Sequence, residues 1–280
     1  MPRVVKAERL APNTFLMVVD SADVARKCQP GQFVMVMPAE NGERIPLNIA
    51  DWDREKGHVS VVFLSLGTTT RKLSRLKAGA ELPVIAGPLG KPVEIARFGT
   101  VLLVGGCYGP GALLPIAYAM RKAGNRVVVL TEAKAPHLLY WQEELGRACD
   151  RLLRLTGRRG ADEDDERKSF MRAEVTSIVK EEKVNRVMAI GCTHLMAGVA
   201  AATGPLAVKT TVMLNPIMLD GTGMCGACRV SVAGRTCFAC VDGPEFDGHR
   251  VDWDELHLRR KAYLDHELES LCRWEKKNYP

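Results

Sequence analysis

Apolar residues in the first part of the chain occur in short runs that alternate with turn residues. Three of these runs, residues 15–19, 32–36 and 59–63, are rich in valine, phenylalanine and other residues that favour strands. Proline, glycine and asparagine cluster between them. This spacing predicts a small antiparallel β-barrel over residues 1–97.

The pattern changes near residue 98. An apolar run at 100–104 enters a glycine-rich turn, a helical pattern continues to about residue 123, and a second apolar run follows at 126–130. Residues 184–190, a glycine turn and an alanine-rich helix repeat the unit. Strands that alternate with helices predict a parallel, Rossmann-like sheet over residues 98–210.

The rest of the chain divides into two parts. Residues 211–250 are rich in cysteine and glycine, and residues 251–280 begin with a D-x-x-E capping box at Asp252 and Glu255. Leucines at helical spacing after it predict one amphipathic C-terminal helix. Residues 157–168 have no apolar side chain larger than alanine and predict a solvated loop.

Composition narrows the class of protein. An apolar share of 46% and a charged share of 26% over 280 residues are typical of globular proteins, and a dispersed net charge of +6 does not indicate nucleic-acid binding. The N-terminus lacks a signal-peptide core, and glycine and proline interrupt the uncharged stretches 100–120 and 187–208. We therefore expect a cytoplasmic protein with no membrane span.

The cysteines carry the strongest chemical signal. Four of the nine lie between residues 225 and 240. Cys225 and Cys228 continue a C-x4-C-x2-C spacing whose first position holds Asp220, and Cys240 is the distant fourth ligand. This spacing predicts a [2Fe–2S] cluster, with a carboxylate that changes its potential relative to an all-cysteine site.

A zinc site is the competing interpretation. Cys225 and Cys228 form one C-x2-C pair, and Cys237 and Cys240 form another, as in structural four-cysteine zinc sites. The gap of eight residues between the pairs is short for such a site. The gap and the aspartate favour the iron–sulfur cluster.

Two segments of the barrel indicate phosphate binding. Arg44 follows the second barrel strand, and an arginine there suits a pyrophosphate. Gly67 precedes three threonines at a predicted helix start, where N–H groups and hydroxyls can meet a phosphate. Each motif alone is weak, because an arginine after a strand is more often a salt-bridge residue.

The order of these motifs resembles one superfamily. R-x-P-L-N-I at 44–49, G-T-T-T at 67–70 and G-P-L-G at 87–90 precede the glycine turn and the cysteine loop. This order resembles the ferredoxin–NADP reductase superfamily. Within it, residues 214–230 and 238–249 are similar to the electron-transfer subunit of dihydroorotate dehydrogenase B, and more so to the small subunit of electron-bifurcating NADH-dependent ferredoxin:NADP oxidoreductase.

The resemblance implies a set of cofactor residues. It implies FAD contacts at Arg44, Pro46, Leu47, Asn48, Gly67, Thr68, Thr69 and Thr70. It implies NAD(P) contacts at Gly105, Gly106, Gly109 and Gly111, and cluster ligands at Asp220, Cys225, Cys228 and Cys240. No side chain is expected to act as a catalytic acid, base or nucleophile.

The nucleotide turn departs from the resemblance. Relatives usually carry a third glycine where this chain has Cys107, and Tyr108 adds bulk beside a turn that must approach a pyrophosphate. Two alternatives stay open: NAD(P)H binding, and a degenerate nucleotide fold kept as a scaffold. Glu132 after the next strand suits a ribose diol and favours NAD, but Lys134 close to it counters that preference, so the choice between NAD and NADP stays open.

The expected function is electron relay between NAD(P)H, FAD and a [2Fe–2S] cluster. The resemblance implies an obligate larger partner with a flavin and [4Fe–4S] clusters, and electron exchange with ferredoxin. One alternative is an electron-transfer subunit of dihydroorotate dehydrogenase. The other is a redox-silent, zinc-binding assembly subunit with a degenerate nucleotide site.

Overall fold

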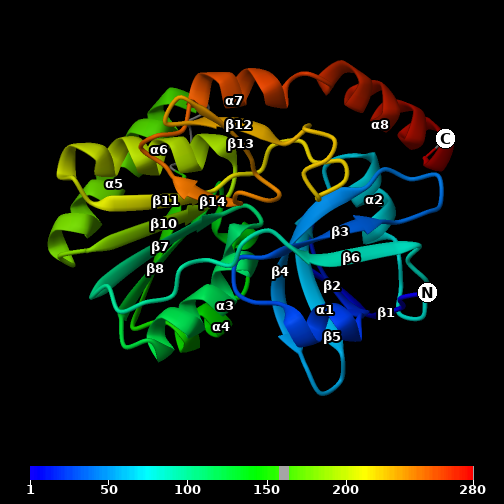
Figure 1. Ribbon diagram of the computed structural model, residues 1–280, viewed down its shortest axis with the longest axis horizontal. Helices are drawn as coiled ribbons and strands as arrows, with labels where there is room; N and C mark the ends of the chain where they lie inside the picture. Colours follow the sequence, from blue (N-terminus) through cyan, green and yellow to red (C-terminus); the bar gives the residue numbers. More distant parts are fainter. Residues whose placement is uncertain (158–163, 280) are drawn as a thin grey trace.

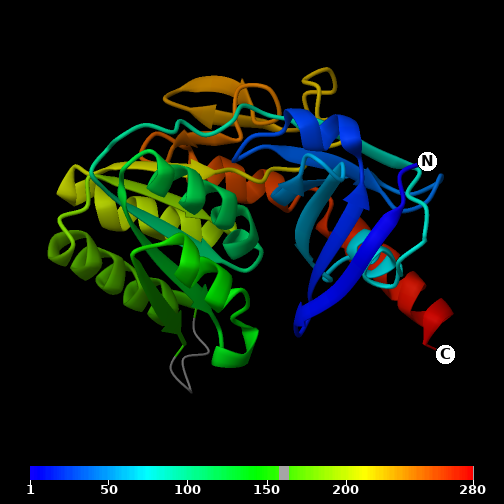
Figure 2. The same cartoon turned by 90° about the horizontal axis from the view of Figure 1, so that it is seen from below.

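The computed structural model describes residues 1–157 and 164–279. Figure 1 shows an N-terminal sheet beside a second sheet flanked by helices, with the cysteine-rich segment and two C-terminal helices crossing above both. In the view of Figure 2 the last helix passes along the N-terminal sheet. The predicted succession of an antiparallel unit, a parallel-sheet unit, a cysteine-rich segment and a helical tail is confirmed.

The N-terminal sheet is antiparallel, with the strand order β1-β2-β5-β4-β3-β6. Its elements are β1 (Val4–Ala11), β2 (Thr14–Asp20), α1 (Ala22–Lys27), β3 (Phe33–Met37), β4 (Ile45–Asp53), β5 (His58–Leu64), α2 (Thr68–Ser74) and β6 (Val84–Leu89). The amide of Val4 donates to Ala80 and that of Leu82 to Pro2, so the two ends of the sheet meet. Alternate apolar side chains fill the interior, as strand periodicity requires.

The second sheet has five parallel strands in the order β11-β10-β7-β8-β9, with β14 antiparallel to β11 at its edge. Its strands are β7 (Thr100–Gly106), β8 (Arg126–Ala133), β9 (Arg151–Thr156), β10 (Arg186–Ile190), β11 (Lys209–Met213) and β14 (Glu245–Asp247). The strand order reverses between β7 and β10. In open α/β sheets, ligands bind at such a switch point, beyond the carboxyl ends of the strands.

Helices cover both faces of this sheet (Figure 1). They are α3 (Gly109–Lys122), α4 (Gln142–Ala148), α5 (Asp164–Glu181) and α6 (Thr193–Thr203), with short 3₁₀ turns at Pro136–Leu138 and Gly204–Leu206. The loop predicted at 157–168 is partly wrong, because α5 already begins at Asp164. Residues 158–163 of that loop lie outside the described residues.

The cysteine-rich segment forms a hairpin of β12 (Arg229–Val232) and β13 (Arg235–Phe238) and then enters the parallel sheet as β14. The prediction of one C-terminal helix is wrong. The tail forms α7 (Trp253–Arg260) and α8 (Leu264–Asn278), which are separated by a turn because Tyr263 has a non-helical φ of −121°. The turn lets α7 pack on the hairpin and α8 on α2.

The capping interaction predicted at the start of α7 is present. The carboxylate of Asp252 accepts the N–H of Glu255 at 2.9 Å, which is the N-cap half of the predicted capping box. Within the described residues, no helix is long and apolar enough to cross a membrane.

Candidate metal centre and cofactor surfaces

Cys228 and Cys240 form the core of the candidate metal centre. Their sulfur atoms lie 3.2 Å apart, and both residues are buried. Cys228 immediately precedes β12, and Cys240 follows β13 by two residues. The amide of Ala239 donates to the carbonyl of Cys228 at 3.1 Å, so the closed hairpin itself brings the two thiols together.

The loop before Cys225 folds around the carboxylate of Asp220. The two oxygens of that carboxylate accept the N–H groups of Thr222 and Cys225, each at 2.9 Å. These two hydrogen bonds, that of Thr222 first, hold the pKa of Asp220 below its usual range. A side chain at Gly221 would lie 2.7 Å from Leu89, so the loop approaches the barrel closely only because glycine stands there.

The thiol of Cys240 favours its neutral form in this structure. Burial first, and then the neighbouring Cys228, raise the pKa of the Cys240 thiol to about 12. A backbone N–H of Gly223 directed at Cys240 acts in the opposite direction. Bound metal ions reverse such shifts because they stabilise the thiolate.

The donor set fits two irons in its chemistry. Three thiols and a carboxylate stand on a glycine-rich loop and the hairpin that follows it. In residues 1–157 and 164–279, however, no three His, Cys, Asp or Glu side chains converge closely enough to hold a metal ion. Cys225 is exposed, so the ligand assignment requires its loop to close on the buried pair.

Cys237 belongs to a different part of the structure. It pairs with Val230 across the hairpin, and both pack against the core beneath α6. Cys228 and Cys240 instead pack with Phe33 and Met35 of β3. A single metal site made of both C-x2-C pairs would need Cys237 to leave that core, so the geometry favours the cluster over the zinc interpretation.

The contact of the thiol pair with β3 also links it to the predicted flavin segment. In the register of β3 and β4, Phe33 lies opposite Asn48 and Met35 lies opposite Pro46. Directly opposed residues share one face of a sheet. Pro46 and Asn48 are therefore on the face that packs against Cys228 and Cys240.

The two predicted flavin segments lie next to each other. The hydroxyl of Thr69 donates to the carboxylate of Glu43 at 3.3 Å, which brings the start of α2 beside the start of β4. Arg44 is exposed at this edge, whereas Leu47 points into the barrel core, so only its backbone is available to a cofactor.

The other two threonine hydroxyls of this segment also have protein partners. That of Thr68 is 2.9 Å from Ser270 of α8, and that of Thr70 donates to the carbonyl of Gly67 at 3.0 Å. The sequence therefore predicts the segment correctly as a helix start, but its hydroxyls serve the fold in this structure.

The glycines of the nucleotide turn are required by packing. A side chain at Gly109 would lie 2.0 Å from the carbonyl oxygen of Ile190, and one at Gly111 would lie 2.8 Å from Val62 of the barrel. Gly105 and Gly106 end β7 and are buried. All four lie at the switch point of the sheet, where the sequence predicts the nucleotide site.

Two tyrosines occupy this turn. The Tyr108 hydroxyl donates to the carbonyl of Gly191 at 2.9 Å and accepts from Asn215 at 2.7 Å. The Tyr140 hydroxyl donates to the Tyr108 carbonyl at 3.0 Å and accepts the N–H of Gly111 at 3.1 Å. Burial raises the pKa of both phenols above the usual range, so both stay neutral hydrogen-bonding groups.

Sequence reasoning missed Tyr140 and Asn215, because no motif connects residues so far from the turn along the chain. Glu132, which the sequence predicts as a contact of a ribose diol, is buried opposite Gly106 at the end of β8, and that role stays a prediction.

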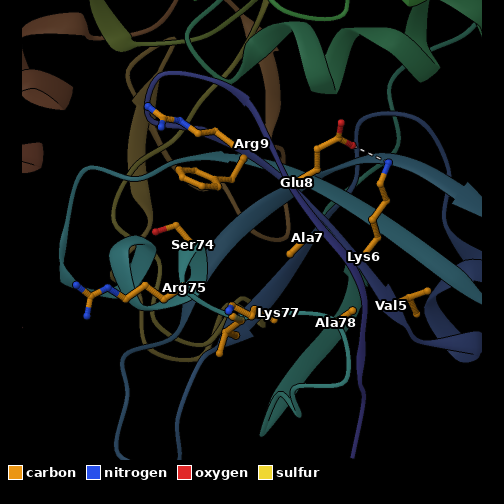
Figure 3. A pocket seen from close by; sticks show the side chains of 11 residues that line it. Val5, Lys6, Ala7, Glu8, Arg9, Ser74, Arg75, Lys77 and Ala78 are labelled. Atoms are coloured by element: carbon orange, nitrogen blue, oxygen red, sulfur yellow. Dashed lines mark ion pairs between the residues drawn. The ribbon is translucent and has the colours of Figure 1, made fainter.

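Surface grooves lie elsewhere. A groove of about 500 Å³ lies between β1 and the end of α2, and the ion pair of Lys6 and Glu8 lies on its β1 side (Figure 3). A second groove of about 390 Å³ lies between β1 and residues 139–144. Neither is lined by a predicted cofactor residue.

Known proteins share both the sequence and the fold. Residues 215–252 match the family described as the iron–sulfur cluster binding domain of dihydroorotate dehydrogenase B. A Thermotoga maritima protein named as a homologue of the electron-transfer subunit of dihydroorotate dehydrogenase B (NAD(+)) is 40% identical over 94% of this chain and 92% of its own. The subunit of that name from Bacillus cereus (strain Q1) is 28% identical over 87% and 94%.

A solved structure agrees with this relationship. A chain from the structure of an NADH-dependent reduced ferredoxin-NADP oxidoreductase, described as giving insight into flavin-based electron bifurcation, is 38% identical and covers 98% of both chains with a TM-score of 0.89. A cytochrome P450 reductase from Amycolatopsis shares the fold at 15% identity and a TM-score of 0.59.

Proposed function

This chain belongs to the family of dihydroorotate dehydrogenase B electron-transfer subunits and their homologues, and we propose that it relays electrons between NAD(P)H, FAD and a [2Fe–2S] cluster. One observation carries the proposal. Cys228 and Cys240 pack against the strand β3, whose neighbour β4 carries Pro46 and Asn48, two of the predicted flavin residues, on the same face. A cluster at the thiols and a flavin on the barrel would therefore be neighbours.

The chain's own residues would bind and orient the cofactors. Flavin, when bound, supplies the change between two-electron and one-electron chemistry. Arg44 would pair with its pyrophosphate, because a guanidinium suits two phosphate oxygens at once. Pro46 and Asn48 would orient its ring system on the face turned to the cysteines. The backbone at Gly67–Thr70 would receive a phosphate.

Asp220, Cys225, Cys228 and Cys240 would hold the irons. The thiol pair is preformed, and the Asp220 loop would close over it. Gly105, Gly106, Gly109 and Gly111 would line the nicotinamide nucleotide site, and Glu132 would meet the ribose diol of NAD. Entry of a pyrophosphate there would require Tyr140 to release the N–H of Gly111.

The partner would approach the cluster loop. Met224 is 90% exposed, and Leu219 and Val241 beside it are also exposed. Apolar side chains exposed around a redox centre suit a protein partner. We propose a larger flavin- and [4Fe–4S]-containing subunit there, with ferredoxin as an electron carrier, in the cytoplasm. The catalytic subunit of a dihydroorotate dehydrogenase is the second candidate for the partner, because relatives are named as electron-transfer subunits of that enzyme or their homologues.

We also propose four units for the chain: the flavin barrel at 1–97, the nucleotide unit at 98–210, the cluster segment at 211–250 and the helical tail at 251–280. The tail would connect the other three, because α7 packs on the hairpin, Arg260 of α7 donates to Thr193 of the nucleotide unit, and α8 packs on α2.

Anaerobic purification tests the function directly. We expect one FAD, two irons and two sulfides per chain, and NADH or NADPH should bleach the flavin and then reduce the cluster. A colourless protein with one zinc and no flavin would instead support the assembly-module alternative. A protein with both cofactors that neither nucleotide reduces would restrict the relay to flavin and cluster.

A further inference from the structure

The helix α7 carries an arginine that binds the cluster loop. The Nε atom of Arg259 donates to the carbonyl of Arg229, and its Nη2 atom donates to the carbonyl of Ala227, each at 3.2 Å. These two carbonyls stand on either side of Cys228. The backbone of this predicted ligand is therefore held from both sides by one guanidinium.

The helix that presents Arg259 is itself firmly placed. The N–H of Asp252 donates to the carbonyl of Ser231 at 2.9 Å, and the indole of Trp253 donates to the carbonyl of Gly248 at 3.1 Å. Leu256, one turn before Arg259, is 1% exposed in the core beneath the hairpin. The backbone of Arg259 is consequently fixed relative to the hairpin, and the two hydrogen bonds of its guanidinium have a defined geometry.

The two arginines at the end of α7 serve different units. Arg260 donates to the hydroxyl of Thr193 at 2.5 Å and to Asn215 at 3.3 Å, both near the nucleotide turn. Arg259 alone of this pair reaches the cysteine loop. The side chain of Arg229 also donates to a loop carbonyl, that of Gly226, at 3.2 Å, but Arg229 is exposed and its charge is screened by solvent.

We infer that Arg259 is a positioning residue for the cluster, fixing the backbone of Cys228 and raising the reduction potential of the irons. This inference rests on the proposed function. A reduced cluster carries one more negative charge than an oxidised one, so a nearby cation stabilises the reduced form more. Arg259 is only partly exposed, which limits the screening of its charge.

The test uses the full chain with its cofactors and three variants. Arg259→Gln removes the charge and the fork of donors, Arg259→Lys keeps the charge alone, and Lys261→Gln removes one charge from an exposed position next to the same helix. The midpoint potential and the EPR spectrum of the cluster are measured by redox titration. Iron and sulfide are counted first in the wild-type chain.

We expect Arg259→Gln to lower the ratio of reduced to oxidised cluster about threefold at the wild-type midpoint, which is a shift of about 30 mV for one electron. Arg259→Gln should also broaden the EPR spectrum. Arg259→Lys should recover most of the potential but should show the same broadening, because a single ammonium cannot hold two carbonyls. Lys261→Gln should match the wild type. Loss of the cluster in Arg259→Gln, with retention in the other two variants, also supports positioning.

Equal potentials and spectra in Arg259→Gln and Lys261→Gln would overturn the inference and leave the proposed function intact. Loss of the cluster in all three variants would overturn it as well, because the effect would then not be specific to Arg259. A wild-type chain without iron and sulfide would overturn both the inference and the proposed function.

Discussion

At the scale of single residues, Cys107 is held in an unusual conformation. Its φ of +57° lies in the left-handed region, which disfavours residues with a Cβ atom. We predict that Cys107→Gly raises the free energy of unfolding by about 0.5–1 kcal/mol, because relief of this strain exceeds the added entropy of glycine in the unfolded chain. Urea unfolding measures the difference.

The same substitution at Cys149 is a matched control. Cys149 is more deeply buried than Cys107, but its own φ of −127° is extended, so Cys149→Gly should lower the free energy of unfolding. A lower stability for Cys107→Gly as well would show that the Cys107 side chain contributes more packing than the conformation costs.

Asp220 tests the ligand assignment residue by residue. We predict that Asp220→Cys keeps two irons and changes the ratio of reduced to oxidised cluster at least about threefold at the wild-type midpoint. The physical reason is that thiolate is a softer, more electron-donating ligand than carboxylate. EPR-monitored titration gives the potential and the spectrum.

The alternative to a ligand role is that Asp220 only holds the loop through hydrogen bonds. Its carboxylate already accepts two loop N–H groups. A residue that only holds the loop would leave both the potential and the EPR spectrum unchanged on substitution by cysteine, and that result would remove Asp220 from the ligands.

At the scale of elements, Glu182 ties the end of α5 to the sheet. Its buried carboxylate pairs with Arg126 of β8 at 2.7 Å and with Arg151 of β9. The hydrogen bond from Arg126, and then that from Arg151, lower the pKa of Glu182. Because the folded pKa lies below the unfolded value of about 4.3, this stabilisation is complete above that pH and is lost as pH falls through the folded pKa.

We predict that Glu182→Gln lowers the free energy of unfolding by about 0.5–1 kcal/mol at pH 7, because both arginines are about half exposed and solvent screens them. The difference between the variant and the wild type should shrink as the pH falls below about 4.3 and vanish below the folded pKa. Denaturant unfolding at pH 7, 5 and 3.5 checks the trend, and a difference that does not shrink with acid would rule out the ion pairs as its cause.

The helix α8 is attached to the barrel through Arg75 of the segment after α2. The guanidinium of Arg75 lies 4.4 Å from the ring of Trp274 and 4.8 Å from that of Tyr279, and it donates to Asn278 at 2.6 Å. Arg71 adds an ion pair with Glu275 at 3.0 Å. With the contact of Thr68 and Ser270 at the start of α2, where the flavin phosphates are predicted, the C-terminal helix braces α2 at both ends.

We predict that Trp274→Ala lowers the free energy of unfolding by about 1–2 kcal/mol and lowers the temperature at which FAD is released. Leu258→Ala, at a residue that is 71% exposed, is the control and should change neither. Flavin fluorescence during heating reports the release. An unchanged release temperature for Trp274→Ala would mean that α8 does not stabilise the flavin site.

The elements that sequence predicted are those with a clear apolar period. β2, β5, β7 and α3 follow directly from such runs. The beginning of α5 does not, because its first turn is Asp-Asp-Glu-Arg, and the helix is held by later residues such as Val175 in the core. The break between α7 and α8 was also missed, because packing on two different units produces it and no glycine or proline marks it.

The residues of the candidate site also fall into two groups, those that the sequence predicted and those that it did not. The cysteines and the flavin segments lie in local motifs, so spacing and resemblance predicted them. Arg259 and Tyr140 reach their sites from distant elements, and nothing near them in sequence signals the contact. The tyrosines in the nucleotide turn show why spacing alone does not decide whether that turn is open to a ligand.

At the scale of the whole molecule, the cysteine segment crosses from the parallel sheet to the barrel (Figure 1). Its buried thiols face β3 of the barrel, and its last strand joins the parallel sheet. Met224, on the loop between Asp220 and Cys225, is 90% exposed. Electrons would thus travel from the barrel through the thiol pair to a partner at the loop.

The central claim is that Cys228 and Cys240, and not Cys237, hold a two-iron cluster. Iron, sulfide and zinc analysis of Cys240→Ser and Cys237→Ser beside the wild type tests it most directly. We predict two irons and two sulfides in the wild type and in Cys237→Ser, with most of both lost in Cys240→Ser. One zinc per chain without sulfide, or equal loss of metal in both variants, would contradict the claim.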